Sequence, residues 1–118
     1  PTAVTIDGQK YSAAEVNFYY QNVYRSFLNS NSYFISYLGL DTSSSLKNQT
    51  INATAASMMG VEEGSSWFDY MMDNAIHQMA YYTIIRDIIS SPVNLKNVGF
   101  SCQKVSVLLR FLENSLFS

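Results

Sequence analysis

The sequence predicts a mainly α fold, in which a short N-terminal strand or hairpin precedes two long packed helices and a C-terminal helix. Two observations carry this prediction. Apolar residues recur at three- and four-residue spacing within residues 13–28, 67–91 and 102–117, which is the period of an amphipathic helix. Before the first of these stretches, an alternating run meets Asp7-Gly8, a dipeptide that is typical of tight turns.

Length and composition limit the possible classes of protein. The chain has 118 residues, which is the size of one domain, and it starts at Pro1, so we expect a mature or trimmed fragment. Its net charge is −2 and its Lys and Arg residues are not clustered, so nucleic acid is not an expected partner. A single cysteine, Cys102, excludes an intrachain disulfide. No window approaches the roughly 18 apolar residues of a membrane span.

The first predicted helix runs from Ala13 to Leu28 and begins with a capping box. The Ser12 hydroxyl is expected to accept a hydrogen bond from a first-turn amide, while the Glu15 carboxylate reaches back to the amide of Ser12. The expected apolar stripe of this helix consists of Val16, Tyr20, Val23, Tyr24 and Phe27.

Residues 29–32 predict a break, and the segment that follows is ambiguous. Residues 33–40, YFISYLGL, fit either a short helix that ends near Gly39 or a buried extended segment. Residues 41–66 are rich in Ser, Thr, Asn and Gly, and they predict a long loop with one helical turn near Ala53–Met59. A loop of this length inside a compact domain is usually functional or mobile.

A second long helix is predicted from its N-cap, Ser66, to a point before Pro92. Asp69 follows the cap by three residues and suits the positive end of the helix dipole. Proline disfavours helical geometry at the residue that precedes it. We expect the inner stripe to be Phe68, Met72, Ala75, Met79 and Tyr82, flanked by Met71, Ile76 and Ile85.

The composition shifts after this helix. Residues 1–89 carry four Lys or Arg and eight Asp or Glu, whereas residues 90–118 carry three and one. A last helix from Cys102 to Phe117 is predicted by an apolar face of Val105, Leu108, Leu109, Leu112 and Leu116. We expect residues 1–118 to form a single domain, in which residues 90–118 are an atypical helical tail.

The N-terminal part resembles the chaperone domain that opens the PrsA/SurA-type peptidyl-prolyl isomerases of the parvulin family. The typical opening of that domain is matched by Asp7-Gly8, Tyr11-Ser12 and Glu15-Val16. Three blocks are similar in order to a clostridial branch of these foldases, namely the tyrosine-rich residues 17–22, YLGLDT at 37–42 and WFDY at 67–70. The similarity covers about residues 3–89 and leaves out the C-terminal tail.

The resemblance implies a helical, extracytoplasmic chaperone domain that holds unfolded polypeptide clients. It also implies an upstream signal or lipoprotein anchor and a downstream parvulin domain in full-length relatives, which would be peptidyl-prolyl cis-trans isomerases. This chain has no room for both, so membrane attachment would depend on an anchor absent from it. A parvulin site also needs histidines, and this sequence has one. We therefore expect no catalysis by this chain.

No group of side chains predicts a catalytic site, a metal site or a cofactor. His77 has one candidate partner at helical spacing, Asp73, which is too few groups for a metal, and we expect His77 at the surface. Cys102 is far from His77 in sequence, and nothing nearby would activate its thiol. Glu62-Glu63 fits a solvated loop better than a pair of acid–base carboxylates.

Nine Tyr, seven Phe and five Met are more aromatic and methionine side chains than one small core needs. Amphipathic tyrosines and adaptable methionines suit the recognition of apolar peptide segments. The residues expected to bind unfolded or extended polypeptide are Tyr19, Tyr20, Tyr24, Met71 and Met72. The alternative is a structural module that forms a homodimer through its helices and buries the same surface against a copy. A small enzyme with an unrecognised site is the third hypothesis.

Overall fold

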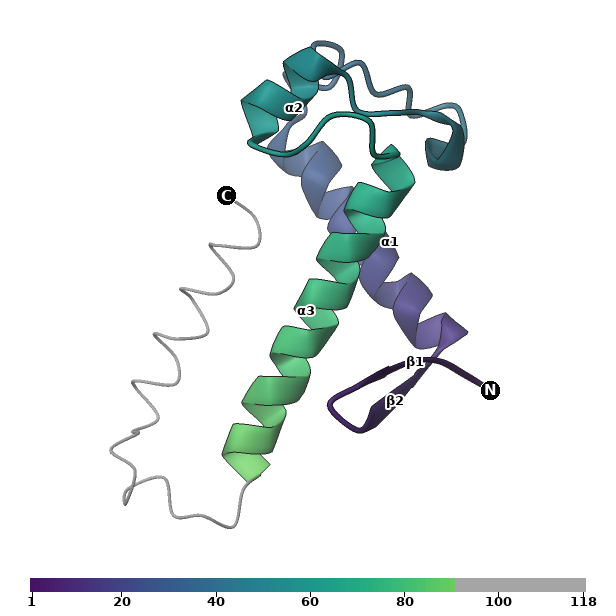
Figure 1. Ribbon diagram of the computed structural model, residues 1–118, viewed down its shortest axis with the longest axis vertical. Helices are drawn as coiled ribbons and strands as arrows, with labels where there is room; N and C mark the ends of the chain where they lie inside the picture. The colour runs from purple at the N-terminus through teal and green to yellow at the C-terminus, as the bar shows by residue number, and fades with distance from the viewer. Residues whose placement is uncertain (91–118) are drawn as a thin grey trace, which may run out of the picture. The chain divides into compact units, whose positions relative to one another are not determined.

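The computed structural model describes residues 1–90, of which 58% are in helices. The elements in chain order are β1 (Thr2–Ile6), β2 (Gln9–Ser12), α1 (Ala13–Ser30), the 3-10 helix η1 (Leu46–Asn48), α2 (Ala53–Met59) and α3 (Trp67–Ser90) (Figure 1). The prediction of a mainly helical fold with a short N-terminal hairpin is confirmed. The predicted helix at 102–117, together with Cys102, lies outside the described residues.

The chain forms two compact units. Among the described residues, the hairpin unit combines residues 1–17 with residues 76–90, and the helical unit comprises Phe18–Ala75. Helices α1 and α3 contribute residues to both units. Each unit has buried side chains of its own. The single-domain prediction extends to residue 118 and stays a prediction.

In the hairpin unit, β1 and β2 pair antiparallel across a two-residue turn. Ile6 lies opposite Gln9, so Asp7 and Gly8 alone form the connection. Both residues have positive φ, 47° and 79°, which is the geometry of the turns that match the twist of a two-stranded hairpin. Asp and Gly tolerate this left-handed region better than most residues do. The predicted turn is therefore confirmed.

The capping box at the start of α1 is also confirmed. The amide of Glu15 donates to Ser12 Oγ at 3.2 Å, and the amide of Ser12 donates to Glu15 Oε1 at 3.2 Å. The Ser12 hydroxyl donates to the same carboxylate oxygen at 3.1 Å. These bonds satisfy amides that have no partner inside the helix. Helix α1 then extends to Ser30, two residues beyond the predicted end.

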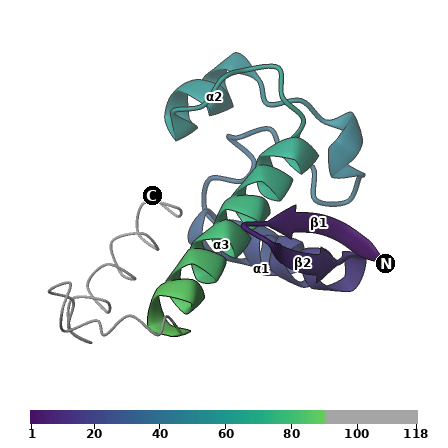
Figure 2. The same ribbon diagram turned by 60° about the horizontal axis from the view of Figure 1, so that its bottom comes forward.

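A buried hydroxyl pair joins the hairpin to α3, and the two lie side by side in both ribbon views (Figures 1 and 2). Thr83 Oγ1 donates to the carbonyl of Met79 at 2.8 Å. Since a threonine hydroxyl has one hydrogen, Tyr11 donates the hydrogen bond that it forms with Thr83 Oγ1. Tyr11, Met79 and Thr83 are all buried. Burial together with satisfied hydroxyls therefore fixes the hairpin against this helix.

In the helical unit, the buried face of α3 differs from the predicted stripe. Trp67, Met71 and Ala75 have no exposed surface, whereas Phe68 and Met72, predicted to face inward, are half-buried. The buried row is therefore shifted by one residue in the first two turns of α3, whereas Ala75 and Met79 are buried as predicted. The reason is Trp67, whose large ring lies 5.7 Å from the ring of Phe27 on α1 and takes the centre of the core.

The connection from Asp41 to Ser66 contains the helical turn that the sequence predicts. Helix α2 begins after Asn52, whose Oδ1 accepts from the amide of Ala55 at 2.8 Å. It ends at Gly60, which has a positive φ of 69° and closes the helix in the left-handed conformation. The predicted bounds, Ala53–Met59, are confirmed.

Candidate functional site

Four of the five predicted binding residues are half-buried, and the fifth is fully buried. Tyr19, Tyr20 and Tyr24 pack against the core cluster of the helical unit, and Met72 is half-buried on α3. Met71 is a member of the core with no exposed surface. A side chain without exposed surface does not reach a client, so Met71 is a core residue.

The tyrosines of α1 contact other rings, which explains their partial burial. The ring of Tyr20 lies 5.4 Å from that of Phe68 and stacks on that of Tyr24 at 6.4 Å. Burial raises the pKa of the Tyr20 hydroxyl above its ordinary value of 10.0, and the neighbouring Tyr24 raises it further. These rings pack against the core and are only partly exposed to solvent.

The two most exposed large apolar side chains of the helical unit, Tyr33 and Tyr37, belong to a different segment, which also exposes Phe34. Tyr33 is 88% exposed, Tyr37 is 71% exposed and Phe34 is 52% exposed. Residues 33–37 are called the aromatic segment below. Three exposed rings within five residues of sequence form an unusual surface, because exposed aromatic groups are normally scattered singly.

Hydrogen-bonded turns explain why these rings point outward. The amide of Phe34 donates to the carbonyl of Asn31 at 2.8 Å, and the amide of Leu38 donates to the carbonyl of Phe34 at 3.0 Å. This backbone is neither of the two predicted alternatives, because it consists of successive turns. Ile35 and Leu38 pack into the core, so their helix-like spacing leaves Tyr33, Phe34 and Tyr37 on the outer side.

The two ends of the aromatic segment are held in place. At its start, Asn31 Nδ2 and the Asn31 amide both donate to the carbonyl of Phe27, at 2.9 and 3.0 Å. At its end, Gly39 has a φ of 73° and lies against Asn52, because a Cβ atom placed on Gly39 would be 2.9 Å from Asn52 Nδ2. The segment is thus fixed to the ends of α1 and α2 and is not a free loop.

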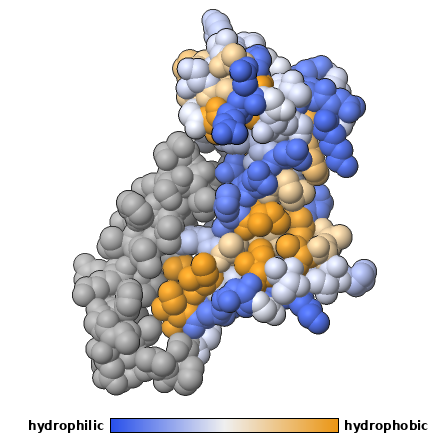
Figure 3. Space-filling model, viewed as in Figure 1, coloured by the Kyte–Doolittle hydropathy of each residue, from blue (hydrophilic) through white to orange (hydrophobic). Residues whose placement is uncertain are grey.

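Helix α2 adds a further exposed apolar side chain to this unit. Its inner residues, Ala55 and Ala56, share the core cluster with Leu38, while Met58 is more than half exposed. Figure 3 shows apolar and hydrophilic side chains interleaved on the visible face of this part of the chain. A mixed surface of this kind suits weak and adaptable contacts better than one permanent interface.

The turn that follows the aromatic segment is closed by polar contacts. Gln49 Oε1 accepts from the amide of Asp41 and Gln49 Nε2 donates to the carbonyl of the same residue, each at 2.8 Å. The Asp41 carboxylate accepts hydrogen bonds from Ser43 and Ser44. These bonds lower the pKa of Asp41 because they favour its charged form. The carboxylate therefore has a structural role as a local turn cap.

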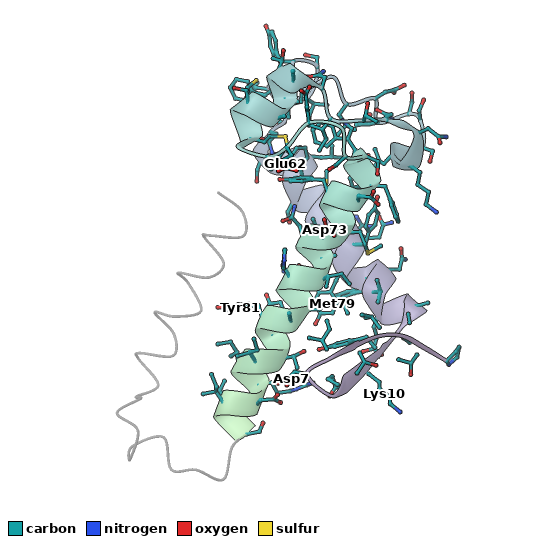
Figure 4. All side chains as sticks on the ribbon, viewed as in Figure 1. Asp7, Lys10, Glu62, Asp73, Met79 and Tyr81 are labelled. Atoms are coloured by element: carbon teal, nitrogen blue, oxygen red, sulfur yellow. The ribbon has the colours of Figure 1, made fainter. Side chains whose placement is uncertain are left out.

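Within residues 1–90, no group of His, Cys, Asp or Glu side chains is arranged to hold a metal ion. His77 is exposed, as the sequence predicted. Glu62 and Glu63 are exposed in the connection that follows α2, and Glu62 is labelled in Figure 4. No helix in this part of the chain combines the length and the apolar character needed to cross a membrane.

Comparisons with protein-family models, curated proteins and solved structures found no match to this chain. The similarity of residues 3–89 to the foldase chaperone domain therefore depends on the sequence blocks alone. The site is accordingly defined by its geometry, which consists of an anchored segment with three exposed rings, half-buried tyrosines on α1, and Met58 on α2.

Proposed function

We propose that this chain is a non-catalytic, chaperone-like domain that holds unfolded or extended polypeptide. The observation that supports the proposal best is the exposure of Tyr33, Phe34 and Tyr37 on a segment whose start is hydrogen-bonded to α1 and whose end lies against Asn52. Rigid aromatic side chains lose little conformational entropy on binding, since each has two side-chain torsions. They also bury a large apolar area, which stabilises a complex by roughly 25 cal/mol per Å².

The half-buried residues of α1 and α3 add further apolar area to the helical unit. Tyr19, Tyr20, Tyr24 and Met72 present partial apolar edges that a flexible client can cover. Tyrosine hydroxyls provide hydrogen bonds to a client backbone without specifying its sequence. This combination favours promiscuous binding of extended chains over recognition of one folded partner.

The resemblance to PrsA/SurA-type foldases extends the proposal to location and family. It supports a position in the cell envelope or a secreted state, and full-length relatives in which a parvulin domain carries out isomerisation. In that arrangement this chain holds clients and contributes no isomerase chemistry of its own. The same resemblance supports binding without a cofactor.

We expect a molar excess of the chain to suppress the light scattering of a reduced, aggregating client. The triple variant Tyr33→Ser, Phe34→Ser, Tyr37→Ser should lose most of this effect and keep its helical circular dichroism, because the replaced side chains are exposed and outside the core. Phe18→Ser is the matched control, since Phe18 is also exposed but lies on α1. It should retain most of the holding activity.

Two outcomes would contradict the proposal. One is scattering that the wild-type chain leaves unchanged, and the other is equal suppression by the wild-type chain and the folded triple variant. The alternative, a homodimer that buries the same rings against a copy, predicts a stable dimer at micromolar concentration in equilibrium sedimentation. In that case the triple variant would be monomeric.

A further inference from the structure

The charges of the helical unit are strongly unbalanced. Among its residues, Arg25 and Lys47 are the cations, and the carboxylates are Asp41, Glu62, Glu63, Asp69 and Asp73. All five carboxylates are exposed. The unit therefore presents net negative charge to solvent, and this charge acts on any flexible chain that approaches it.

The aromatic segment lies in a stretch of the chain without cations. Residues 26–46 contain no Lys or Arg, and neither do residues 48–75. The one cation between these stretches, Lys47, has its Nζ 4.9 Å from the ring centre of Phe68 and so already interacts with an aromatic face. No basic side chain of the unit is available near the aromatic segment in sequence to pair with an acidic client.

Aromatic rings and carboxylates favour the same kind of ligand. The faces of Tyr33, Phe34 and Tyr37 carry negative potential and attract Lys and Arg side chains. The Asp41 carboxylate follows the segment closely, and its hydrogen bonds from Ser43 and Ser44 keep it ionised. Glu62 and Glu63 come shortly after Met58, the exposed large apolar residue of α2, in sequence.

We propose that the aromatic segment selects client segments that combine apolar residues with Lys or Arg, and that it disfavours segments rich in Asp or Glu. This inference depends on the proposed function, because it names the class of polypeptide that the same surface holds. Apolar contact with the exposed rings supplies binding, and the net negative charge of the helical unit supplies the preference. Electrostatic complementarity generally contributes more to the choice of partner than to affinity.

Fluorescence anisotropy with labelled peptides of equal length tests this selection on the full chain. Three peptides share the same Leu and Phe positions and carry Lys, Glu or Ser at the others, and a fourth has Lys and Ser without apolar residues. We expect the apolar Lys peptide to bind about fivefold more tightly than the Ser peptide, near the upper end of one exposed ion pair. The Glu peptide should bind more weakly than both.

Salt and substitution separate charge from apolar contact. The preference for Lys should shrink between about 20 mM and about 500 mM salt, as the screening length falls from roughly 20 Å to roughly 4 Å. The variant Glu62→Gln, Glu63→Gln should reduce the preference and leave the binding of the Ser peptide unchanged. The triple variant at residues 33, 34 and 37 should weaken the binding of all three apolar peptides.

The outcomes distinguish the inference from the proposed function. Equal binding of the Lys, Glu and Ser peptides would overturn the charge preference and leave the polypeptide-holding function in place. Binding of the Lys peptide that lacks apolar residues, at the same strength, would overturn the inference by showing attraction through charge alone. Absence of binding by every peptide would overturn both.

Discussion

Single polar side chains determine where the helices of this chain begin. The hydroxyls of Ser12 and Ser66 each accept a hydrogen bond from the amide three residues later, at 3.2 and 3.0 Å. The carboxamide oxygen of Asn52 does the same at 2.8 Å. First-turn amides have no partner inside a helix, so these contacts replace water with a protein acceptor.

The substitution Ser12→Ala should lower the free energy of unfolding by about 1 kcal/mol, because the Glu15 amide loses its acceptor. The midpoint of urea denaturation would shift to lower concentration with an unchanged slope. Ser12→Asp, which keeps an acceptor at the cap, is the control and should retain most of the stability. An unchanged midpoint in Ser12→Ala would show that the cap does not stabilise the fold.

Tyr20 should make stability depend on pH in the alkaline range. Burial and the neighbouring Tyr24 raise its pKa in the folded state above the ordinary 10.0. Above about pH 10 the Tyr20 hydroxyl ionises more readily in the unfolded chain than in the folded one. The free energy of unfolding is therefore unaffected by this group below about pH 10 and falls as the pH rises through the folded-state pKa. Denaturation midpoints measured across this range should fall less steeply for Tyr20→Phe than for the wild-type chain. Tyr33→Phe, at an exposed ring, is the control, and identical slopes for all three proteins would contradict this assignment.

At the scale of elements, two glycines close turns that other residues would strain. Gly39 ends the turns that carry the aromatic segment, with φ of 73°, and Gly60 ends α2 with φ of 69°. Their surroundings differ. A Cβ atom at Gly60 would meet open space, whereas one at Gly39 would be 2.9 Å from Asn52 Nδ2. Asn52 cannot move away easily, because its Oδ1 caps α2.

Substitution by alanine should separate the strain of the left-handed backbone, which Gly39 and Gly60 share, from the steric contact with Asn52, which only Gly39 makes. Gly60→Ala should cost about 1 kcal/mol, which is the strain of a left-handed conformation. Gly39→Ala should cost about 2 kcal/mol, because the same strain is joined by loss of the Asn52 cap. Thermal unfolding of both variants beside the wild-type chain provides the comparison. Equal losses in the free energy of unfolding would mean that the contact between residue 39 and Asn52 does not contribute to stability.

At the scale of the whole molecule, net charge and exposed rings act in opposite directions. The chain carries −2 at pH 7 and has an isoelectric point near 5.1. Repulsion between copies therefore falls as the pH approaches 5. The exposed rings of the aromatic segment are then free to associate with one another.

We expect equilibrium sedimentation to give a higher average mass at about pH 5 than at about pH 7.5, because the net charge vanishes near the isoelectric point. The triple variant Tyr33→Ser, Phe34→Ser, Tyr37→Ser should show little of this increase, since its exposed apolar area is smaller. An increase that is equal in the variant would assign self-association to another surface. A mass that does not change with pH would show that the rings do not drive self-association.

The predictions that the structure confirms at residue level depend on neighbours in sequence. Asp7-Gly8 forms the hairpin turn, Ser12 and Ser66 begin helices, and α2 spans Ala53–Met59 as expected. Each of these features is decided within about four residues, by backbone torsions and by hydrogen bonds between near neighbours. Such features are readable from the sequence because they need no information about distant segments.

Tertiary structure alone decided which apolar residues are buried. The sequence pattern placed Phe68 and Met72 inward and Met71 beside them, whereas packing around Trp67 buries Met71 and leaves the other two half-exposed. Likewise, the exposed aromatic surface belongs to residues 33–37 and not to the tyrosines of α1. A wide apolar stripe offers several possible inner faces, and the choice among them depends on the volumes that other elements bring to the core. Sequence spacing therefore determined the elements, and packing between them determined which aromatic side chains are exposed to solvent.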